Sequence, residues 1–402
     1  MGNIIENIKK SISIVRVAFE FYPMKGGSIT HIIESAKYIN PYLENQIIIA
    51  PDFGDTSKDF DASFPIPILR VNYLKFNFLK KIKFPIVPLI LFIYSINVLR
   101  ILKNKKNDYI LYIHGTLLGA IICLLNKFYQ LNKPIIVFQD SANIFNISKR
   151  SALSGHLAFS LFKYSKPDIL LIIDDGNKLL DFVNKCKTNN INYSILYHAI
   201  NTEFFYPQKL KKSDNNFIVL STQRLDNFKR VDLGIYAFKK FLEKNNFPNN
   251  AKLIIVGDGD ERNNLNKIVI NNNLQNWIEF HGFKEINDII DYLNNVDVVI
   301  GTSLISNLNL SIQEAMACEK AVILFNTGEI DRLIKNFENG ILIEPINIEE
   351  FAIMIDKLYK YSELRERIGK NARITIIKDR NWESRIKKEL EIFNNILKTY
   401  YS

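Results

Sequence analysis

The feature that most constrains the fold is a regular alternation of short apolar runs with longer helical stretches. Continuous apolar strands that alternate with helices predict parallel sheets covered by helices on both faces. A polar stretch around 201–216, which contains Pro207, separates two such series, and this predicts two doubly wound α/β domains. The predicted strands are 12–19, 46–50, 109–113, 134–138 and 168–173, then 217–221, 251–256, 277–280, 297–300, 321–324 and 340–343.

The 402 residues give room for two or three domains, each with its own core. We expect a first domain over 1–205 and a second over 206–380. Residues 381–402, which begin near Trp382, read as one amphipathic helix. In doubly wound sheets, ligands bind beyond the carboxyl ends of the strands, so the loops that follow strands are where functional residues are expected.

The composition excludes several classes of protein. Hydrophobic residues make up 47% of the chain and aromatic residues 12%, which excludes a disordered chain. The three cysteines are too far apart for a zinc or redox motif and odd in number for a disulfide framework, so we expect buried thiols in a reducing compartment: Cys123, Cys186 and Cys318. The first ten residues are polar and do not resemble a secretory signal, which leads us to expect a cytoplasmic protein.

The excess of positive charge is local. The net charge is +10, and residues 62–107 hold nine basic residues and no acidic one. This confinement argues against a nucleic-acid partner. Four lysines of the stretch are interleaved with apolar residues and favour binding to an anionic membrane surface, such as the inner face of the plasma membrane: Lys75, Lys80, Lys81 and Lys83. The alternative is a solvated basic loop beside a core helix.

The longest apolar run lies in the same region. Residues 84–99 contain Pro85 and Pro88 and fall short of the roughly 20 residues that a bilayer span needs. We therefore expect a buried or interfacial helix there and not a transmembrane segment.

Two loops of the first domain follow predicted strands. Gly26 and Gly27 precede a helix, where glycines let backbone amides approach an anion such as phosphate, although a plain turn explains them equally well. The pair does not belong to a G-x-G-x-x-G fingerprint, so a dinucleotide cofactor loses support. His114 directly follows the strand 109–113 and precedes Gly115, and its position suits either ligand binding or a structural role.

Two loops of the second domain carry further candidates. Arg224 and Lys229 flank the loop after 217–221, and two cations at such a loop suit a diphosphate, unless they form only a solvated basic turn. The small polar loop after 297–300 opens a helix that carries Glu314. A carboxylate there could accept hydrogen bonds from a ribose diol, but a lone glutamate on a helix is usually a surface residue.

Together these segments resemble family 4 of the retaining glycosyltransferases, and the similarity covers nearly the whole chain. The strongest part is Ser-Ile-Gln-Glu-Ala-Met-Ala-Cys at 311–318 with the strand that follows. Ala-Lys-Leu-Ile-Ile-Val-Gly-Asp-Gly at 251–259 is similar to the family's second-domain strand and glycine turn. Segments 339–345 and 201–207 match a late signature and the inter-domain segment.

The resemblance implies the GT-B architecture, in which two Rossmann-like domains face a cleft and the C-terminal helix crosses back to the first domain. It implies transfer of a sugar, with retention, from a nucleotide-diphosphate sugar to a glycan or lipid-linked acceptor in cell-surface polysaccharide or glycoconjugate synthesis. By the resemblance, Gly26 and Gly27 approach the donor diphosphate. Arg224 and Lys229 bind that diphosphate, and Glu314 binds the nucleotide ribose. His114 lies beside the transferred sugar and completes the catalytic set with the two cations.

The sequence also departs from the family. Ser306 stands where a second glutamate is usual, and Asn307-Leu308-Asn309 replaces a Gly-aromatic-Gly. We expect backbone amides of residues 306–310 (Ser306, Asn307, Leu308, Asn309 and Leu310) to contact the sugar and phosphate instead. No dense Asp or His cluster offers a metal site, so we expect metal-independent transfer with no cofactor beyond the nucleotide sugar. Because Ser306 replaces the usual carboxylate, a second hypothesis is an inactive GT-B subunit that binds or scaffolds a partner. A sugar-nucleotide epimerase of the same architecture has less support.

Overall fold

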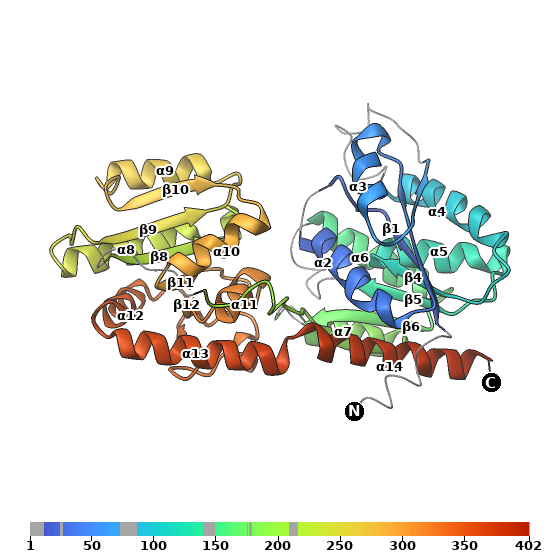
Figure 1. The fold of residues 1–402 in the computed structure, drawn as a ribbon. Coiled ribbons are helices and arrows are strands. Elements are labelled where there is room, and N and C mark those ends of the chain that lie inside the picture. The colour runs from blue at the N-terminus through green and yellow to red at the C-terminus, as the bar shows by residue number, and fades with distance from the viewer. Residues whose placement is uncertain are drawn as a thin grey trace. The chain divides into compact units, whose positions relative to one another are not determined.

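The computed structural model describes residues 12–24, 27–72, 87–139, 149–174, 176, 179–208, 216–306 and 308–401. The chain forms two compact units, coloured along the sequence in Figure 1. The first unit consists of Met1–Asp174, Lys178–His198 and Glu383–Ser402. The second consists of Asp175–Asn177 and Ala199–Trp382.

The first unit is built on a seven-stranded parallel sheet in the order β3-β2-β1-β4-β5-β6-β7. The strand order reverses between β1 and β4, where Ala18 pairs with His114. This reversal is the topological switch point, where a doubly wound sheet opens a crevice for ligands. The strands are β1 (Ser13–Ala18), β2 (Asn45–Pro51), β3 (Ile68–Val71), β4 (Ile110–His114), β5 (Ile135–Gln139), β6 (Ile169–Asp174) and β7 (Tyr193–Tyr197).

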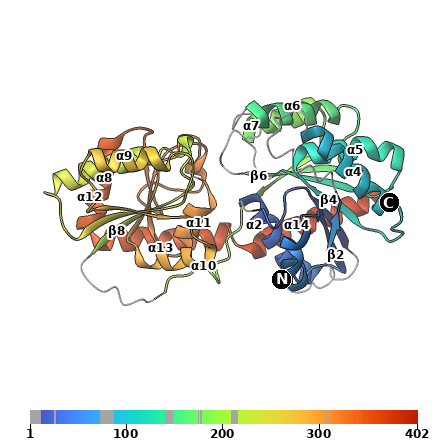
Figure 2. The same ribbon diagram turned by 90° about the horizontal axis from the view of Figure 1, so that it is seen from above.

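Helices cover both faces of this sheet, as Figure 2 shows. One face carries α4 (Val87–Lys103), α5 (Thr116–Tyr129), α6 (Lys149–Phe162) and α7 (Leu179–Thr188), which share one apolar cluster with the strands. The other face carries α2 (Gly27–Ile39) and α14 (Trp382–Tyr401). Short helices complete the unit: η1 (Asn40–Tyr42), η2 (Gly54–Ser57) and α3 (Lys58–Ser63).

The second unit repeats this plan with six parallel strands in the order β10-β9-β8-β11-β12-β13, and its switch point lies between β8 and β11. The strands are β8 (Phe217–Thr222), β9 (Ala251–Val256), β10 (Ile278–Gly282), β11 (Val298–Gly301), β12 (Ala321–Phe325) and β13 (Ile341–Ile343). One apolar cluster joins the sheet to α8 (Val231–Lys244), α9 (Arg262–Asn271) and α12 (Ile348–Lys360). A second cluster joins it to α10 (Ile286–Asn295), α11 (Leu310–Ala317) and α13 (Ser362–Asp379).

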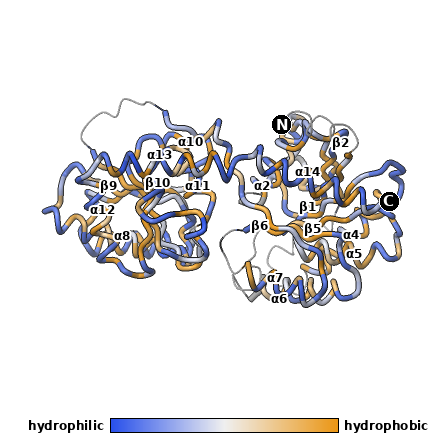
Figure 3. Tube along the Cα trace, turned by 90° about the horizontal axis from the view of Figure 1, so that it is seen from below, coloured by the Kyte–Doolittle hydropathy of each residue, from blue (hydrophilic) through white to orange (hydrophobic). Residues whose placement is uncertain are grey.

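The expected fold class is confirmed, because both units have parallel sheets of Rossmann-like order. Figure 3 shows hydrophobic residues gathered along β1, β5 and β6, as expected for strands buried on both faces. We expected the first domain to reach residue 205, whereas in the structure its N-terminal part runs to His198 and the second unit continues from Ala199. The physical reason is that Ile200 and Phe205 pack into the apolar cluster of the second unit.

The C-terminal helix belongs to the first unit, although the chain reaches it through the second. The Tyr112 hydroxyl donates to Glu389 Oε1 at 2.7 Å, and the rings of Tyr112 and Phe393 meet edge to face at 5.7 Å. The side chains of Glu389 and Phe393, both on α14, are fully buried. Helix α14 is therefore part of the core of the unit that it joins.

The apolar run at 84–99 corresponds largely to α4. Leu91, Val98 and Leu99 are buried against the sheet, whereas Leu89 and Phe92 are exposed. No helix in the described part of the chain has the length and apolar character to cross a membrane. All three cysteines are free and buried.

Candidate functional site

The loops after β8 and β11 meet at the switch point of the second sheet. Residues Val219 of β8 and Val298 of β11 are paired neighbours, so the two loops leave the sheet side by side. The Thr302 hydroxyl donates to the carbonyl oxygen of Lys229 at 3.1 Å, and the Leu304 amide donates to the carbonyl oxygen of Phe228 at 3.2 Å. These bonds fix the basic loop against the loop that leads to α11.

The backbone around Arg224 is also fixed from the other side. The amide of Leu225 donates to the carbonyl oxygen of Asp258 at 3.0 Å, in the turn that follows β9. Gly257 in that turn has a φ of +138°, and a Cβ there would lie 2.0 Å from the Gln223 carbonyl oxygen. Only glycine allows this approach. The glycine turn at 257–259 thus supports the loop that carries Arg224.

The structure brings Arg224 and Lys229 to one aromatic ring. The guanidinium carbon of Arg224 lies 5.9 Å from the centroid of the Phe228 ring, and Nζ of Lys229 lies 5.5 Å from it. The Arg224 side chain is 73% exposed and forms an ion pair with Asp226 at 3.0 Å. An exposed guanidinium on a fixed loop can exchange this partner for an anion at little reorganisation cost.

Glu314 lies on α11, the helix that follows β11. The residue is partly exposed, but its carboxylate is packed closely enough that burial raises its pKa to about 7. A carboxylate with this pKa gains by accepting hydrogen bonds, because hydroxyl donors compensate for lost hydration. The position therefore suits a ligand that brings neutral hydroxyl groups.

The loop that precedes α11 uses several of its own polar groups. Ser306 is buried, and its hydroxyl oxygen accepts the Leu308 amide at 3.0 Å. Asn309 caps α11, since its Oδ1 accepts the Ile312 amide at 3.1 Å, and Leu310 is the first helical residue. Two of the amides expected to face a donor, those of Ser306 and Leu308, are thus directed at serine oxygens of the loop itself. Asn307 lies outside the described residues.

The candidates of the first unit lie at its own switch point. His114 ends β4 beside Ala18 of β1, and Gly27 begins α2, the helix that follows β1. Gly26 lies outside the described residues, so the predicted glycine turn is represented only by Gly27. Both positions are at the ligand-binding edge of the first sheet.

His114 is held by an arginine that the sequence analysis did not single out. Arg16 is fully buried in β1, and its Nη1 lies 3.2 Å from Nε2 of His114. Because a guanidinium can only donate, Nε2 is the acceptor and the imidazole proton resides on Nδ1. Burial, with a further effect of the positive charges of Arg16 and Arg385, holds the pKa of His114 well below its usual value. The histidine is neutral at pH 7.

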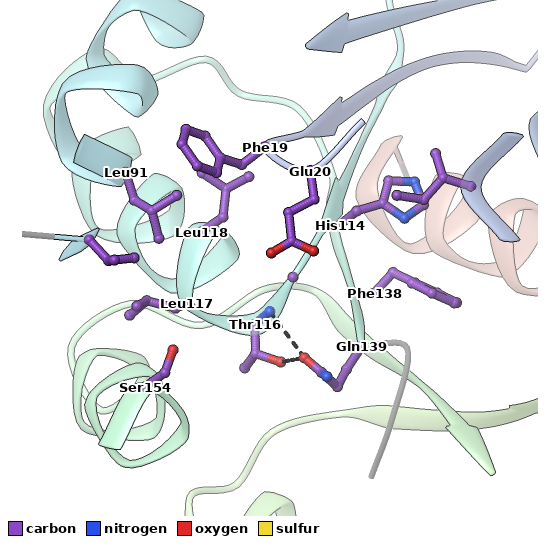
Figure 4. A pocket seen from close by; sticks show the side chains of 13 residues that line it. Phe19, Glu20, Leu91, His114, Thr116, Leu117, Leu118, Phe138, Gln139 and Ser154 are labelled. Atoms are coloured by element: carbon purple, nitrogen blue, oxygen red, sulfur yellow. Dashed lines mark hydrogen bonds between the residues drawn. The ribbon is translucent and has the colours of Figure 1, made fainter. Parts of the chain in front are cut away.

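A pocket lies beside His114 at the ends of β1, β4 and β5 (Figure 4). Its volume is about 310 Å³. Glu20, two residues beyond β1, extends its carboxylate into the pocket, and sequence reasoning missed this residue. The signal was present, because Glu20 is the first charged side chain after a predicted strand.

The basic stretch is only partly described. Lys75, Lys80, Lys81 and Lys83 lie outside the described residues, so their predicted membrane contact stays a prediction. Arg70 is described and has a structural role. It forms a bidentate ion pair with Asp61, at 2.8 and 2.6 Å, and donates to two carbonyl oxygens, so it is not part of a free basic surface.

Within the part of the chain that the structure describes, no group of three or more His, Cys, Asp or Glu side chains could hold a metal ion. The loop after β8 carries Arg224 and Lys229, and the helix after β11 carries Glu314. This combination can bind a diphosphate and a diol.

Comparison with known proteins gives a family match for the second unit. Residues 202–375 match the model of the family described as glycosyl transferases group 1. The match spans less than half of the chain, and it makes the second unit similar to that family. The matched segment covers nearly all of the second unit, including Arg224, Lys229 and Glu314.

Relatives and solved structures extend this similarity. An uncharacterized glycosyltransferase of Methanocaldococcus jannaschii is 25% identical, over 96% of this chain and all of its own length. The poly(ribitol-phosphate) alpha-N-acetylglucosaminyltransferase of Staphylococcus aureus is 28% identical, over 56% of this chain and 46% of its own. The structure of HepE from Anabaena in complex with UDP has a TM-score of 0.75 at 18% identity, covering 96% of this chain and all of that one. The chain thus has the GT-B fold.

Proposed function

We propose that the protein transfers a sugar from a UDP-sugar, with retention and without a metal ion, to a glycan or lipid-linked acceptor in the synthesis of a cell-surface polysaccharide or glycoconjugate. The observation that carries the proposal is the pair of cations, Arg224 and Lys229, on one fixed loop at the switch point of the second sheet. Glu314 on the helix after the neighbouring strand adds the acceptor for a ribose diol. Uridine is chosen because HepE was solved with UDP.

In the proposed reaction, the bond between the anomeric carbon and the diphosphate oxygen breaks. The acceptor hydroxyl oxygen bonds to the same face of that carbon, and its proton passes to a diphosphate oxygen. Negative charge grows on the departing diphosphate, and Arg224 and Lys229 stabilise it. Neutral His114 contacts the sugar. No enzymic nucleophile is required, because a nucleotide diphosphate is already a good leaving group.

The first prediction concerns nucleotide binding by the second unit. Arg224→Ala or Lys229→Ala is expected to weaken UDP binding about ten- to a hundredfold, because each removes a charge-assisted hydrogen bond to the diphosphate. Isothermal titration calorimetry with UDP measures this. Arg367→Ala serves as the matched control, because Arg367 is an exposed arginine on α13 and its loss changes the net charge equally. Equal UDP affinity in all of these proteins would contradict the assigned roles.

A second candidate function is an inactive GT-B subunit that binds or scaffolds a partner. It is favoured by Ser306, which is buried and offers a hydroxyl where the family usually has a carboxylate. The two candidates differ in turnover. Release of UDP from UDP-sugars by the purified chain, with or without acceptor, supports the enzyme; UDP binding without any release supports the inactive subunit.

A further inference from the structure

The pocket beside His114 has two chemically different sides. One side is apolar and comes from the end of β1 and from helices α4 and α5: Phe19, Val87, Leu91, Leu117 and Leu118. Figure 4 shows Phe19, Leu91, Leu117 and Leu118 on this side. The pocket lies at the switch point of the first sheet, where ligands of doubly wound folds bind.

The other side carries polar groups beside the ring of Phe138. The hydroxyl of Thr116 and its amide both donate to Oε1 of Gln139, the amide at 3.3 Å. This double acceptance fixes the Gln139 side chain with its NH₂ group turned away from Thr116. The Glu20 carboxylate extends toward Thr116 and stands between the polar and apolar sides (Figure 4).

This arrangement selects among acceptors. A wholly polar glycan would place hydroxyl groups against the apolar side, where they would lose hydration without gaining a hydrogen bond. A purely apolar ligand would place hydrocarbon against the Glu20 carboxylate and the polar groups of Thr116 and Gln139 without offering them a hydrogen bond. A hydroxyl group joined to a hydrocarbon satisfies both sides.

We propose that this pocket binds the acceptor, and that the acceptor is a glycolipid-type molecule whose sugar hydroxyl hydrogen-bonds to Glu20 while its hydrocarbon group packs on Val87, Leu91 and Leu118. The inference rests on the proposed function, because it assigns the acceptor of that reaction. Glu20 is a binding residue that selects the class of acceptor, and the reacting proton still passes to the diphosphate.

The test uses two probes that differ only in the hydrocarbon: n-octyl β-D-glucopyranoside below its micelle concentration, and methyl β-D-glucopyranoside. Binding to the full chain is measured without nucleotide by saturation-transfer difference NMR titration. The octyl glycoside is expected to bind at least about tenfold more tightly, because burial of even two methylenes accounts for that ratio. Equal affinity for the two glycosides overturns the proposal.

Variants locate the binding. Val87→Lys is expected to weaken octyl glycoside binding at least about fivefold and to leave methyl glycoside binding unchanged. Leu89→Lys is the matched control, because Leu89 is exposed on the same helix and does not line the pocket. Val87 is itself 42% exposed, so the substitution is compatible with folding. Equal losses in the two variants, or none in either, would show detergent adsorption to the surface and overturn the proposal.

Glu20→Gln separates the polar contact from the apolar one. It is expected to weaken both glycosides about fivefold or more, because a hydrogen bond to a charged acceptor is lost, and to leave UDP affinity unchanged. If Glu20→Gln weakens the binding of neither glycoside, Glu20 is not part of the binding site. UDP binding by the unmodified protein separates this inference from the proposed function. If the protein binds UDP but does not prefer the octyl glycoside, only the acceptor inference is refuted. If it prefers the octyl glycoside but does not bind UDP, the proposed donor is refuted and the acceptor pocket stands.

Discussion

Glu314, for which we propose a binding role, lowers the stability of the folded protein at neutral pH and above. Its pKa of about 7 lies well above the ordinary glutamate value, because burial disfavours the charged form. Between about pH 5 and pH 7 the folded chain holds a proton that the unfolded chain has released. The free energy of unfolding therefore rises as the pH falls from 8 toward 5. Above pH 7 the folded protein carries the full unfavourable effect of the charge.

Replacing Glu314 by glutamine removes that effect. Glu314→Gln is expected to stabilise the protein by about 1–2 kcal/mol at pH 8 and to change its stability little at pH 5, after allowance for the partial exposure of the side chain. The same substitution should weaken UDP binding at pH 8. Urea unfolding at the two pH values and calorimetry with UDP measure these effects. Glu363→Gln on α13, which is exposed, is the control, and an equal pH dependence in both variants would contradict the argument.

Some of the candidate site residues could be predicted from the sequence and others could not. Arg224 and Glu314 were predicted, because each follows a strand in a segment with recognisable neighbours. Arg16 was not, although an arginine inside an apolar strand is unusual, because its partner His114 is 98 residues away and only the folded sheet brings them together. Phe228, which joins the two cations, had no distinguishing pattern either.

At the scale of elements, α14 introduces charge into the core of the first unit. Glu389 is fully buried, accepts from the Tyr112 hydroxyl, and lies 3.4 Å from Nε of Arg385. Arg385 also donates to the carbonyl oxygen of Tyr197 at 2.7 Å. A carboxylate in such a place offsets the charge of the buried arginines around it, and its removal leaves them uncompensated.

Glu389→Gln is therefore expected to lower the free energy of unfolding by about 3 kcal/mol or more, because it breaks a buried ion pair from one side. Urea unfolding followed by circular dichroism measures the change. Glu391→Gln, two residues along the same helix and exposed, should change stability by less than about 0.5 kcal/mol. Similar losses in the two variants would mean that helix propensity, and not the buried pair, dominates.

In the first sheet, the strands that sequence reasoning found and missed differ in burial. The inner strands were predicted within one or two residues, because strands buried on both faces are continuous apolar runs. The two missed strands, β3 and β7, lie at the two edges of the first sheet. Edge strands are covered less and mix polar with apolar residues, as Arg70 in β3 and Ser194 in β7 do, so their pattern resembles that of a loop.

At the scale of the whole molecule, the uneven charge and the exposed apolar residues at the start of α4 favour contact with a membrane surface. Val87, Leu89 and Phe92 are exposed, and the basic stretch that holds four lysines directly precedes α4 in the chain. Each cation close to an anionic surface contributes about 1 kcal/mol. A glycolipid acceptor would be met at that surface.

The full chain is expected to sediment with vesicles that contain anionic lipid and to remain in solution with neutral ones. Replacing Lys75, Lys80, Lys81 and Lys83 together by serine should reduce the binding at least about tenfold. The control replaces four lysines of the second unit by serine: Lys239, Lys240, Lys267 and Lys357. Equal sedimentation with both kinds of vesicle would argue against a role for the basic stretch, and so would equal losses in the two variants.

The membership of α14 in the first unit has a consequence for the order in which the protein matures on the ribosome. The strands of that unit are synthesised first, but Glu389 and Phe393 emerge only after the entire second unit has been translated. The second unit has all of its own strands and helices by then, and can fold beforehand. The part made earliest is thus completed last, and until α14 is synthesised the sheet face that carries Tyr112 lacks the helix that covers it.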